Sequence, residues 1–322
     1  MLNLGLHVAV IGTGRVGRPT AYTLLCEGFI DELTVVDIKP GLAKAFAEEL
    51  RHVAASLRLD VKINAYERDE DVSGADIVIV CAGYPRKPGV KISRRELITK
   101  NAEIIKYIAE VVPPNNPDAK YVIVTNPVDA MATLFKTISK ADFVISTGTH
   151  LETLRFKARL ALELGVPVSK ISGYVGGEHG EAATILWSTV TVYGIPLDEY
   201  IKANNIKLDK NSIEYYVKKI SSQIINAIGG TEYGPAAAFR DIVKAIALNR
   251  DEVLSIATPM KFSDIPIPVH VSIPIRVGMK LGPTLYEILS EDEKEGIRKA
   301  AKAVYETYKR AAKLVGMEAE LT

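Results

Sequence analysis

The residues of this chain that could transfer a proton lie in two short segments. His179 sits between glycines in the sequence Gly-Glu-His-Gly at residues 177–180. An imidazole suits a proton donor and acceptor because its pKa lies near neutral pH. Glu152 and Arg155 are three residues apart in a predicted helix, so their side chains share one face. Each has an ordinary alternative: a structural loop histidine, and a surface ion pair worth about 0.2–0.5 kcal/mol.

Polar segments also follow five predicted strands, each at the point where the strand ends. These segments are residues 12–17, 37, 82–89, 125–127 and 147–150, and each follows a run rich in valine and isoleucine. In an open parallel sheet, the ligand crevice lies outside the carboxyl ends of the strands. The five segments therefore predict one shared site, and we expect the chain to be an enzyme.

The first of these segments has the spacing of a dinucleotide-binding loop. Gly12, Gly14 and Gly17 would permit a tight turn, a close approach of pyrophosphate, and close packing of helix on strand. Asp37, twenty residues later at the next strand end, predicts hydrogen bonds to the adenosine ribose and repulsion of a 2′-phosphate. Its alternative role is a turn or capping residue. We expect NAD as cofactor, with NADP secondary because Lys39 is close by.

The order of apolar and helical stretches predicts an α/β fold in two domains. Residues 1–148 are expected to form a Rossmann domain, a doubly wound parallel sheet with helices near 18–28, 42–57 and 96–112. Residues 149–322 are expected to form an α+β substrate-binding and catalytic domain. Its predicted helices run from about 151 and over 212–228, 235–248 and 291–315, with β-rich stretches at 172–192 and 252–277. Because no flexible linker separates them, we expect the halves to pack directly together.

Composition excludes several classes of partner. The chain has 322 residues, of which 48% are hydrophobic and 25% charged, and a net charge of +1. Since neither charge clusters into a long run, nucleic acid and anionic membrane are poor partners. No stretch approaches the roughly 20 apolar residues that span a bilayer, and the first apolar run is a predicted strand, so we expect a cytoplasmic protein.

The minor residue types add two expectations. Cys26 and Cys81 are expected to pack in the structure rather than form a disulfide or hold a metal, and no metal site is predicted. The single glutamine, Gln223, beside abundant lysine, arginine and glutamate, favours a thermophilic source.

Four motifs together resemble those of the lactate and malate dehydrogenase family. They are Gly-Thr-Gly-Arg-Val-Gly (12–17), Ala-Gly-Tyr-Pro-Arg-Lys-Pro-Gly (82–89), Val-Thr-Asn-Pro-Val-Asp (124–129) and Gly-Glu-His-Gly (177–180). The sequence looks most like the lactate-dehydrogenase-like malate dehydrogenases of that family. The resemblance implies reversible hydride transfer between malate or oxaloacetate and NAD, with a small dicarboxylate as substrate.

The resemblance also implies individual roles. His179 would exchange a proton with the substrate oxygen, Glu152 would orient that histidine, and Arg155 would pair with the 1-carboxylate in a planar, bidentate manner. Glu152 departs from the family pattern, in which aspartate is usual, so the reach to His179 differs by one methylene. Further positions implied around substrate and cofactor are Ala82, Gly83, Asn126 and Thr231.

The resemblance also implies roles for two arginines of the segment after residue 82, and the first of them argues for oxaloacetate and malate. Arg86 matches the position that binds the second carboxylate of a four-carbon diacid, where lactate dehydrogenases usually carry glutamine; its alternative is a solvated basic loop. Arg94 best matches the arginine that polarises the ketone. Four residues separate Gly89 from Arg94 where two are expected, which leaves Arg95 as the alternative for that role. The two extra residues also lengthen the loop near residues 84–96, which is expected to close over the site and exclude water.

Several alternatives stay open at this point. A lactate dehydrogenase, or a reductase of both oxaloacetate and pyruvate, is the nearest, and Arg86 argues against it. An NAD-dependent glycosidase would need a metal, and a catalytically inactive NAD-binding redox sensor would lack one of the key residues. We expect a homo-oligomer, a tetramer before a dimer. Lys157 and Ser172 stand where sugar-phosphate-activated lactate dehydrogenases hold arginine and histidine, so that activation is not expected.

Overall fold

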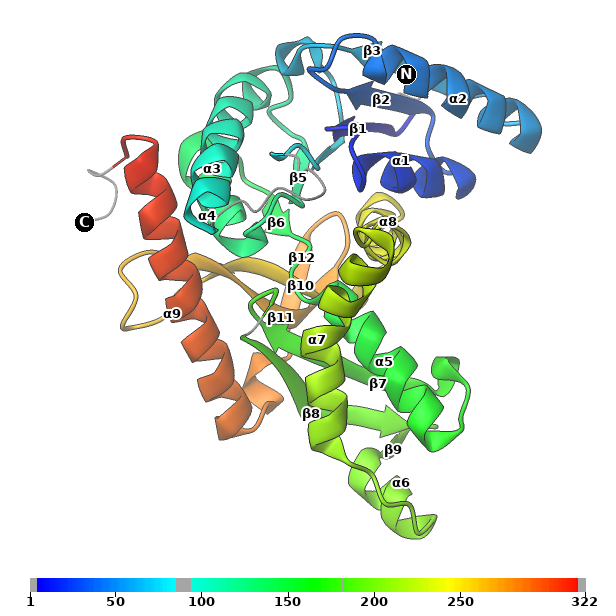
Figure 1. The fold of residues 1–322 in the computed structure, drawn as a ribbon, viewed down its shortest axis with the longest axis vertical. Coiled ribbons are helices and arrows are strands. Elements are labelled where there is room, and N and C mark those ends of the chain that lie inside the picture. The colour runs from blue at the N-terminus through cyan, green and yellow to red at the C-terminus, as the bar shows by residue number, and fades with distance from the viewer. Residues whose placement is uncertain (1–4, 85–93, 181, 318–322) are drawn as a thin grey trace.

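The fold is built on one long sheet with helices on its faces (Figure 1). It is seen in a computed structural model that describes residues 5–84, 94–180 and 182–317. In those residues the strand order is β3-β2-β1-β4-β5-β6-β10-β11-β7-β8-β9, with β12 paired to β11. None of the described helices is long and apolar enough to cross a membrane.

The first six strands form the parallel half of the sheet. They are β1 (His7–Ile11), β2 (Glu32–Val36), β3 (Lys62–Tyr66), β4 (Ile77–Val80), β5 (Lys120–Ile123) and β6 (Val144–Ser146). All neighbouring pairs among them are parallel, in the doubly wound order 3-2-1-4-5-6. β1 and β4 are buried at every position, because helices cover both faces of the sheet. The predicted Rossmann fold is confirmed.

Four helices accompany these strands: α1 (Gly17–Cys26), α2 (Leu42–Leu57), α3 (Arg94–Val111) and α4 (Val128–Ser139). Three of them match the predicted helices to within two residues at each end. The sequence did not lead us to α4 or β3. The first eight residues of α4 are all buried, so the helix lacks the polar stripe that marks amphipathic helices. β3 is an edge strand whose residues are mostly half-buried, so its hydrophobic pattern is weak.

The second half mixes helices with antiparallel strands, as predicted. Its helices are α5 (His150–Leu164), α6 (Leu197–Ala203), α7 (Lys210–Ile228), α8 (Tyr233–Ala247) and α9 (Glu291–Leu314). Its strands are β7 (Ile171–Gly177), β8 (Ala183–Val192), β9 (Ile195–Pro196), β10 (Glu252–Met260), β11 (Val269–Val277) and β12 (Leu281–Thr284). α9 begins with a capping box formed by Ser290 and Glu293.

The two halves are joined through the sheet itself. β10 pairs with β6 at Ala257 and Ser146, and β11 pairs with β7 at Ser272 and Gly177. Helices cross the junction as well, since α8 packs on α1, and α9 packs on α3 and α4 (Figure 1). The direct packing of the halves is therefore confirmed. It brings the end of β7 beside the end of β6 and the start of α5.

Candidate active site

His179, Glu152 and Arg155 come together in one cluster, as the sequence predicts. The Nδ1 atom of His179 lies 3.1 Å from a carboxylate oxygen of Glu152, and Nη1 of Arg155 donates to Glu152 across 3.3 Å. Glu152 is only 3% exposed. The alternative of a solvated surface ion pair is therefore wrong for Glu152 and Arg155. The extra methylene of Glu152, relative to aspartate, does not prevent the contact with His179.

Electrostatics in the cluster favour a protonated histidine. The negative charge of Glu152 raises the pKa of His179 to about 9, against the opposing effect of burial, and Asp129 adds to the rise. Burial raises the pKa of Glu152, but His179 and Arg155 outweigh it, so the net shift is downward. At neutral pH the imidazole therefore carries a proton that it can donate, beside an ionised carboxylate.

The local backbone explains why Glu152 faces His179. Glu152 lies in the first turn of α5, and Thr153 in the next position accepts a hydrogen bond from the N–H of Val175 in β7 (3.0 Å). This bond fastens α5 to the strand that leads to His179. β7 then ends at Gly177, which has φ 93° and whose Cβ would lie 2.5 Å from the carbonyl of Ala182. Only glycine fits this turn without strain.

Replacing Glu152 tests the pair. Glu152→Gln should lower kcat for oxaloacetate reduction by about 10²-fold, within the usual range of acid–base catalysis. The pKa of His179, raised to about 9, should fall toward its ordinary 6.5, because the charge that stabilises the imidazolium is lost. The activity of the variant should therefore decline from a lower pH than that of the wild type. Measuring kcat and kcat/KM over a series of pH values gives both the loss of turnover and the change in pKa.

Two further variants serve as controls for this prediction. Glu152→Asp keeps the charge and should retain the high pKa, whereas Glu163→Gln removes a carboxylate from an ion pair with Arg159 at the other end of α5 and should change neither value. An unaltered rate and pH profile in Glu152→Gln would reduce Glu152 to a packing partner of Arg155.

A second carboxylate, Asp129, holds the main chain of His179 and was not assigned a role from the sequence. Its Oδ2 accepts from the N–H of His179 (3.0 Å), and its Oδ1 accepts from the hydroxyl of Ser146 (2.5 Å). Burial raises the pKa of Asp129 to about 6 despite these bonds. The available signal was its place in the Asn-Pro-Val-Asp motif, two residues after Pro127.

The glycine loop has the shape that a dinucleotide requires. Gly12 has φ 91°, and a Cβ there would lie 2.5 Å from the N atom of Ala82, while a Cβ on Gly17 would lie 1.8 Å from the carbonyl oxygen of Gly12. A Cβ on Gly14 would meet no described atom within 4 Å. The main chain at Gly14 is thus open to the close approach of a phosphate at the start of α1. These residues fit NAD.

Asp37 lies beside this loop at the end of β2. Its Oδ2 accepts from the N–H and the hydroxyl of Thr13 (2.9 and 3.1 Å), and its Oδ1 accepts from the N–H of Lys39 (3.0 Å). The capping role and the ribose-binding role are therefore compatible, because the carboxylate is only half-buried and is fixed next to the phosphate loop. Lys39 is exposed.

The ends of β4 and β5 are tied together by Asn101 of α3, which is buried. Its Oδ1 accepts from the N–H of Tyr84 (2.7 Å), and its Nδ2 donates to the carbonyl of Asn126 (2.6 Å). Thr125 also donates to the carbonyl of Ala82 (2.5 Å). The segment that contains Ala82 and Gly83 is thereby held beside Asn126, as the strand-end argument expects.

An ion pair brings the segment of Thr231 to the glycine loop. Arg15, between Gly14 and Gly17, donates to Glu232 across 2.8 Å. The side chain of Arg15 also lies against Gly230, where a Cβ would be 2.6 Å from its Cδ. Thr231 is half-buried and lies between these two contacts in the sequence. The structure therefore places Thr231 on the segment that faces the glycine loop.

The remaining predicted residues fall outside this description. Arg86 lies outside the described residues, and so do the side chains of Arg94 and Arg95, although α3 begins at Arg94. His150, the last residue of the polar segment 147–150, is buried with its Nε2 atom 3.5 Å from Asp241, and it belongs to the junction of α5 and α8. Among the described residues, no group of three histidine, cysteine or acidic side chains could hold a metal.

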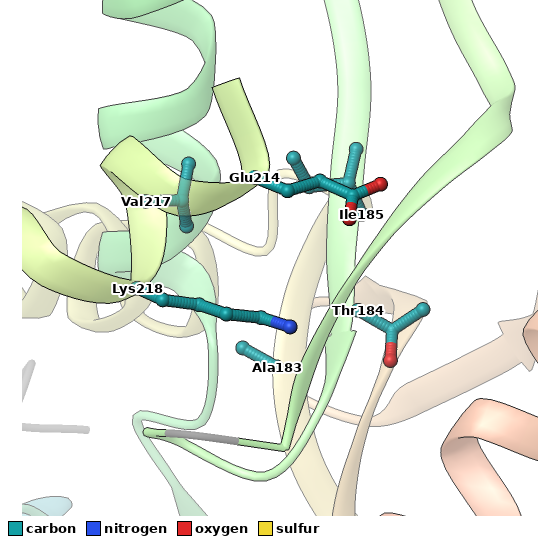
Figure 2. A pocket seen from close by; sticks show the side chains of 6 residues that line it. All are labelled: Ala183, Thr184, Ile185, Glu214, Val217 and Lys218. Carbon is teal, nitrogen blue, oxygen red and sulfur yellow. The ribbon is translucent and has the colours of Figure 1, made fainter. Parts of the chain in front are cut away.

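A small cavity of about 70 Å³ lies between β8 and α7 (Figure 2). Its lining consists of Ala183, Thr184, Ile185, Glu214, Val217 and Lys218. The lining includes none of the residues that the sequence assigned to substrate or cofactor.

Comparison with known proteins decides the family. The model of the lactate/malate dehydrogenase NAD binding domain matches residues 6–143, and that of the lactate/malate dehydrogenase alpha/beta C-terminal domain matches residues 149–315. The chain belongs to the lactate/malate dehydrogenase family. Its resemblance to that family, inferred from four motifs, is confirmed, and so is the NAD-binding character of its first half.

Relatives within the lactate/malate dehydrogenase family include both activities. A malate dehydrogenase of Sulfurisphaera tokodaii is 44% identical over 94% of this chain and 95% of its own length. An L-lactate dehydrogenase of Thermus aquaticus is 32% identical over 97% of this chain and 100% of its own. The crystal structure of Cryptosporidium parvum malate dehydrogenase superposes with a TM-score of 0.88 at 28% identity, covering 96% of this chain and 100% of that one.

Proposed function

We propose that this chain is an NAD-dependent malate dehydrogenase that interconverts malate and oxaloacetate. The observation that carries the proposal is the buried Glu152 paired with His179 beside Arg155, in a chain that is 44% identical to a malate dehydrogenase. Lactate dehydrogenase activity is the second candidate, because relatives with that name also align over nearly the full length.

Several residues of the chain have separate roles in the reduction of oxaloacetate. NADH supplies the hydride when it is bound. Protonated His179 donates its proton to the ketone oxygen as charge develops there, and Glu152 stabilises the imidazolium beforehand. Arg155, next to this pair, binds the 1-carboxylate. Arg86 binds the second carboxylate, and Arg94 polarises the ketone, with Arg95 as the alternative for that role. The segment that carries these arginines excludes water when it closes.

The two halves of the chain have separate tasks in this proposal. Residues 1–148 bind the cofactor through Gly12, Gly14, Gly17, Asp37, Ala82, Gly83 and Asn126. Residues 149–322 supply the proton donor and the arginine for the 1-carboxylate, and Thr231 lies beside nicotinamide and substrate. We also propose a homo-oligomer, a tetramer before a dimer, and a thermophilic source.

Asp37 is expected to make NADH the preferred cofactor over NADPH by at least about tenfold, or about 1.4 kcal/mol. Asp37→Ser should narrow that preference, because it removes the repulsion of the 2′-phosphate and leaves Lys39 free to attract it. The measurement is kcat/KM for both cofactors at saturating oxaloacetate. Asp60→Ser, at an exposed carboxylate outside the loop, is the control and should leave the ratio unchanged. If the wild-type protein used NADPH more efficiently than NADH, Asp37 would not have the proposed role of selecting NADH.

The basic test of the proposed function is NADH oxidation in three mixtures, with oxaloacetate, with pyruvate and without substrate. We expect turnover with oxaloacetate and none without substrate. NADH binding without turnover on either acid would instead identify an inactive cofactor-binding sensor.

A further inference from the structure

Asp129 is a buried carboxylate at the point where the two halves of the molecule meet. It is 2% exposed and lies in the first turn of α4, directly after the strand end at Asn126. One oxygen accepts from the main chain of His179 and the other accepts from Ser146, the last residue of β6. The Ser146 hydroxyl oxygen in turn accepts from the N–H of Gly148 (3.2 Å). A single side chain thus ties α4 and β6 to the segment of His179.

Burying Asp129 as a charged carboxylate costs free energy. Removing a carboxylate from water is unfavourable when its partners are a hydroxyl and a single N–H group. The N-terminus of α4 recovers part of that cost, because helix N-termini stabilise negative charge. An asparagine could accept the hydrogen bond from His179 without an ion, but its amide nitrogen could not accept the one from Ser146. The carboxylate is thus both a double acceptor and a negative charge that acts on His179.

The charged groups that face His179 in the described structure are Glu152 and Arg155 from α5 and Asp129 from α4. Glu152 contacts the ring at Nδ1, and Asp129 contacts the main chain of the same residue. The two carboxylates thus approach from different helices, one on each half of the molecule. The ring is held from one side and the backbone from the other.

We propose that Asp129 is a positioning residue for the proton donor: it fixes the His179 segment to the cofactor-binding half, and its negative charge stabilises the protonated imidazole of His179. The inference rests on the proposed function, because it assigns Asp129 to the proton donor of that reaction. Loss of the charge should weaken the donor even where the hydrogen bond from the N–H of His179 is kept.

The test is Asp129→Asn, which retains the size of the side chain and can still accept from His179. The apparent pKa in the pH profile of kcat/KM for malate oxidation should fall by about one unit, since an opposite charge close by is removed. We expect kcat for oxaloacetate reduction, which needs the protonated imidazole, to fall by up to about tenfold above pH 9, and the dissociation constant for NADH to stay within about twofold. Ser146→Ala is the matched control, because it breaks the other bond of Asp129 but leaves the carboxylate ionised near pH 9, where His179 titrates, so the pKa of His179 should not move.

A measurement on the wild type does not depend on the folding of a variant. The amide proton of His179 should shift in NMR spectra as Asp129 titrates near pH 6. An amide that does not respond to the ionisation of Asp129 anywhere between about pH 3 and 7, or an Asp129→Asn profile that matches the wild type, would overturn the proposal for Asp129. Absence of turnover in the wild type would instead refute the proposed function, so the two failures are distinguishable.

Discussion

Replacing His179 by asparagine is expected to lower kcat for oxaloacetate reduction by about 10²–10⁴-fold, the usual contribution of a positioned acid or base. The side-chain amide of asparagine does not donate a proton as an acid at neutral pH. The imidazole of His179 beside Glu152 has a pKa of about 9, so it is protonated at neutral pH and can donate. NADH binding should stay nearly intact, since the glycine loop lies on other elements. Steady-state kinetics and NADH fluorescence titration measure the two properties separately.

The matched control for this variant is His52→Asn. His52 is an exposed histidine of α2 and should affect neither property. A loss below tenfold in His179→Asn, with the protein folded and NADH bound, would remove His179 from the role of proton donor.

Replacing Arg86 by glutamine is expected to narrow the preference for oxaloacetate over pyruvate sharply. An arginine in a closed, water-poor site must be paired with an anion, because an unpaired buried charge is costly. Oxaloacetate supplies a second carboxylate and pyruvate does not. In Arg86→Gln, kcat/KM for oxaloacetate should therefore fall by about 10²-fold or more, while the value for pyruvate holds or rises.

A variant at the proposed binding site for the 1-carboxylate distinguishes a change in substrate specificity from a general loss of activity. Arg155→Gln should impair both substrates together, since each has the 1-carboxylate that Arg155 is proposed to bind. If oxaloacetate efficiency survives in Arg86→Gln, Arg86 is a solvated residue of its loop. The preference for malate over lactate would then need another explanation.

What could be predicted from the sequence follows from local rules. Gly12, Gly14 and Gly17 could be recognised as a dinucleotide-binding pattern because their roles are short-range. The structure shows close contacts at Gly12 and Gly17 and open space at Gly14. Glu152 and Arg155 could be placed on one face because helix geometry fixes residues three apart. The packing of both side chains in the interior could not be foreseen from that spacing.

What could not be predicted depends on contacts between distant segments. Asp129 meets His179 across fifty residues, and Arg15 meets Glu232 across more than two hundred. The hydrophobic periodicity of the sequence does not indicate such pairs, because they form only when β7 pairs with β11 and α8 packs on α1. Helix α4 was missed for a related reason, since its burial on nearly all sides erases the amphipathic pattern.

The most direct test of the malate assignment is the ratio of kcat/KM for oxaloacetate to that for pyruvate in the wild-type protein with NADH. The account predicts a ratio of about 10⁴ or more, since pyruvate leaves the charge of Arg86 without a partner. A ratio near one, or one that favours pyruvate, would contradict the assignment and identify the chain as a lactate dehydrogenase or a reductase of both acids.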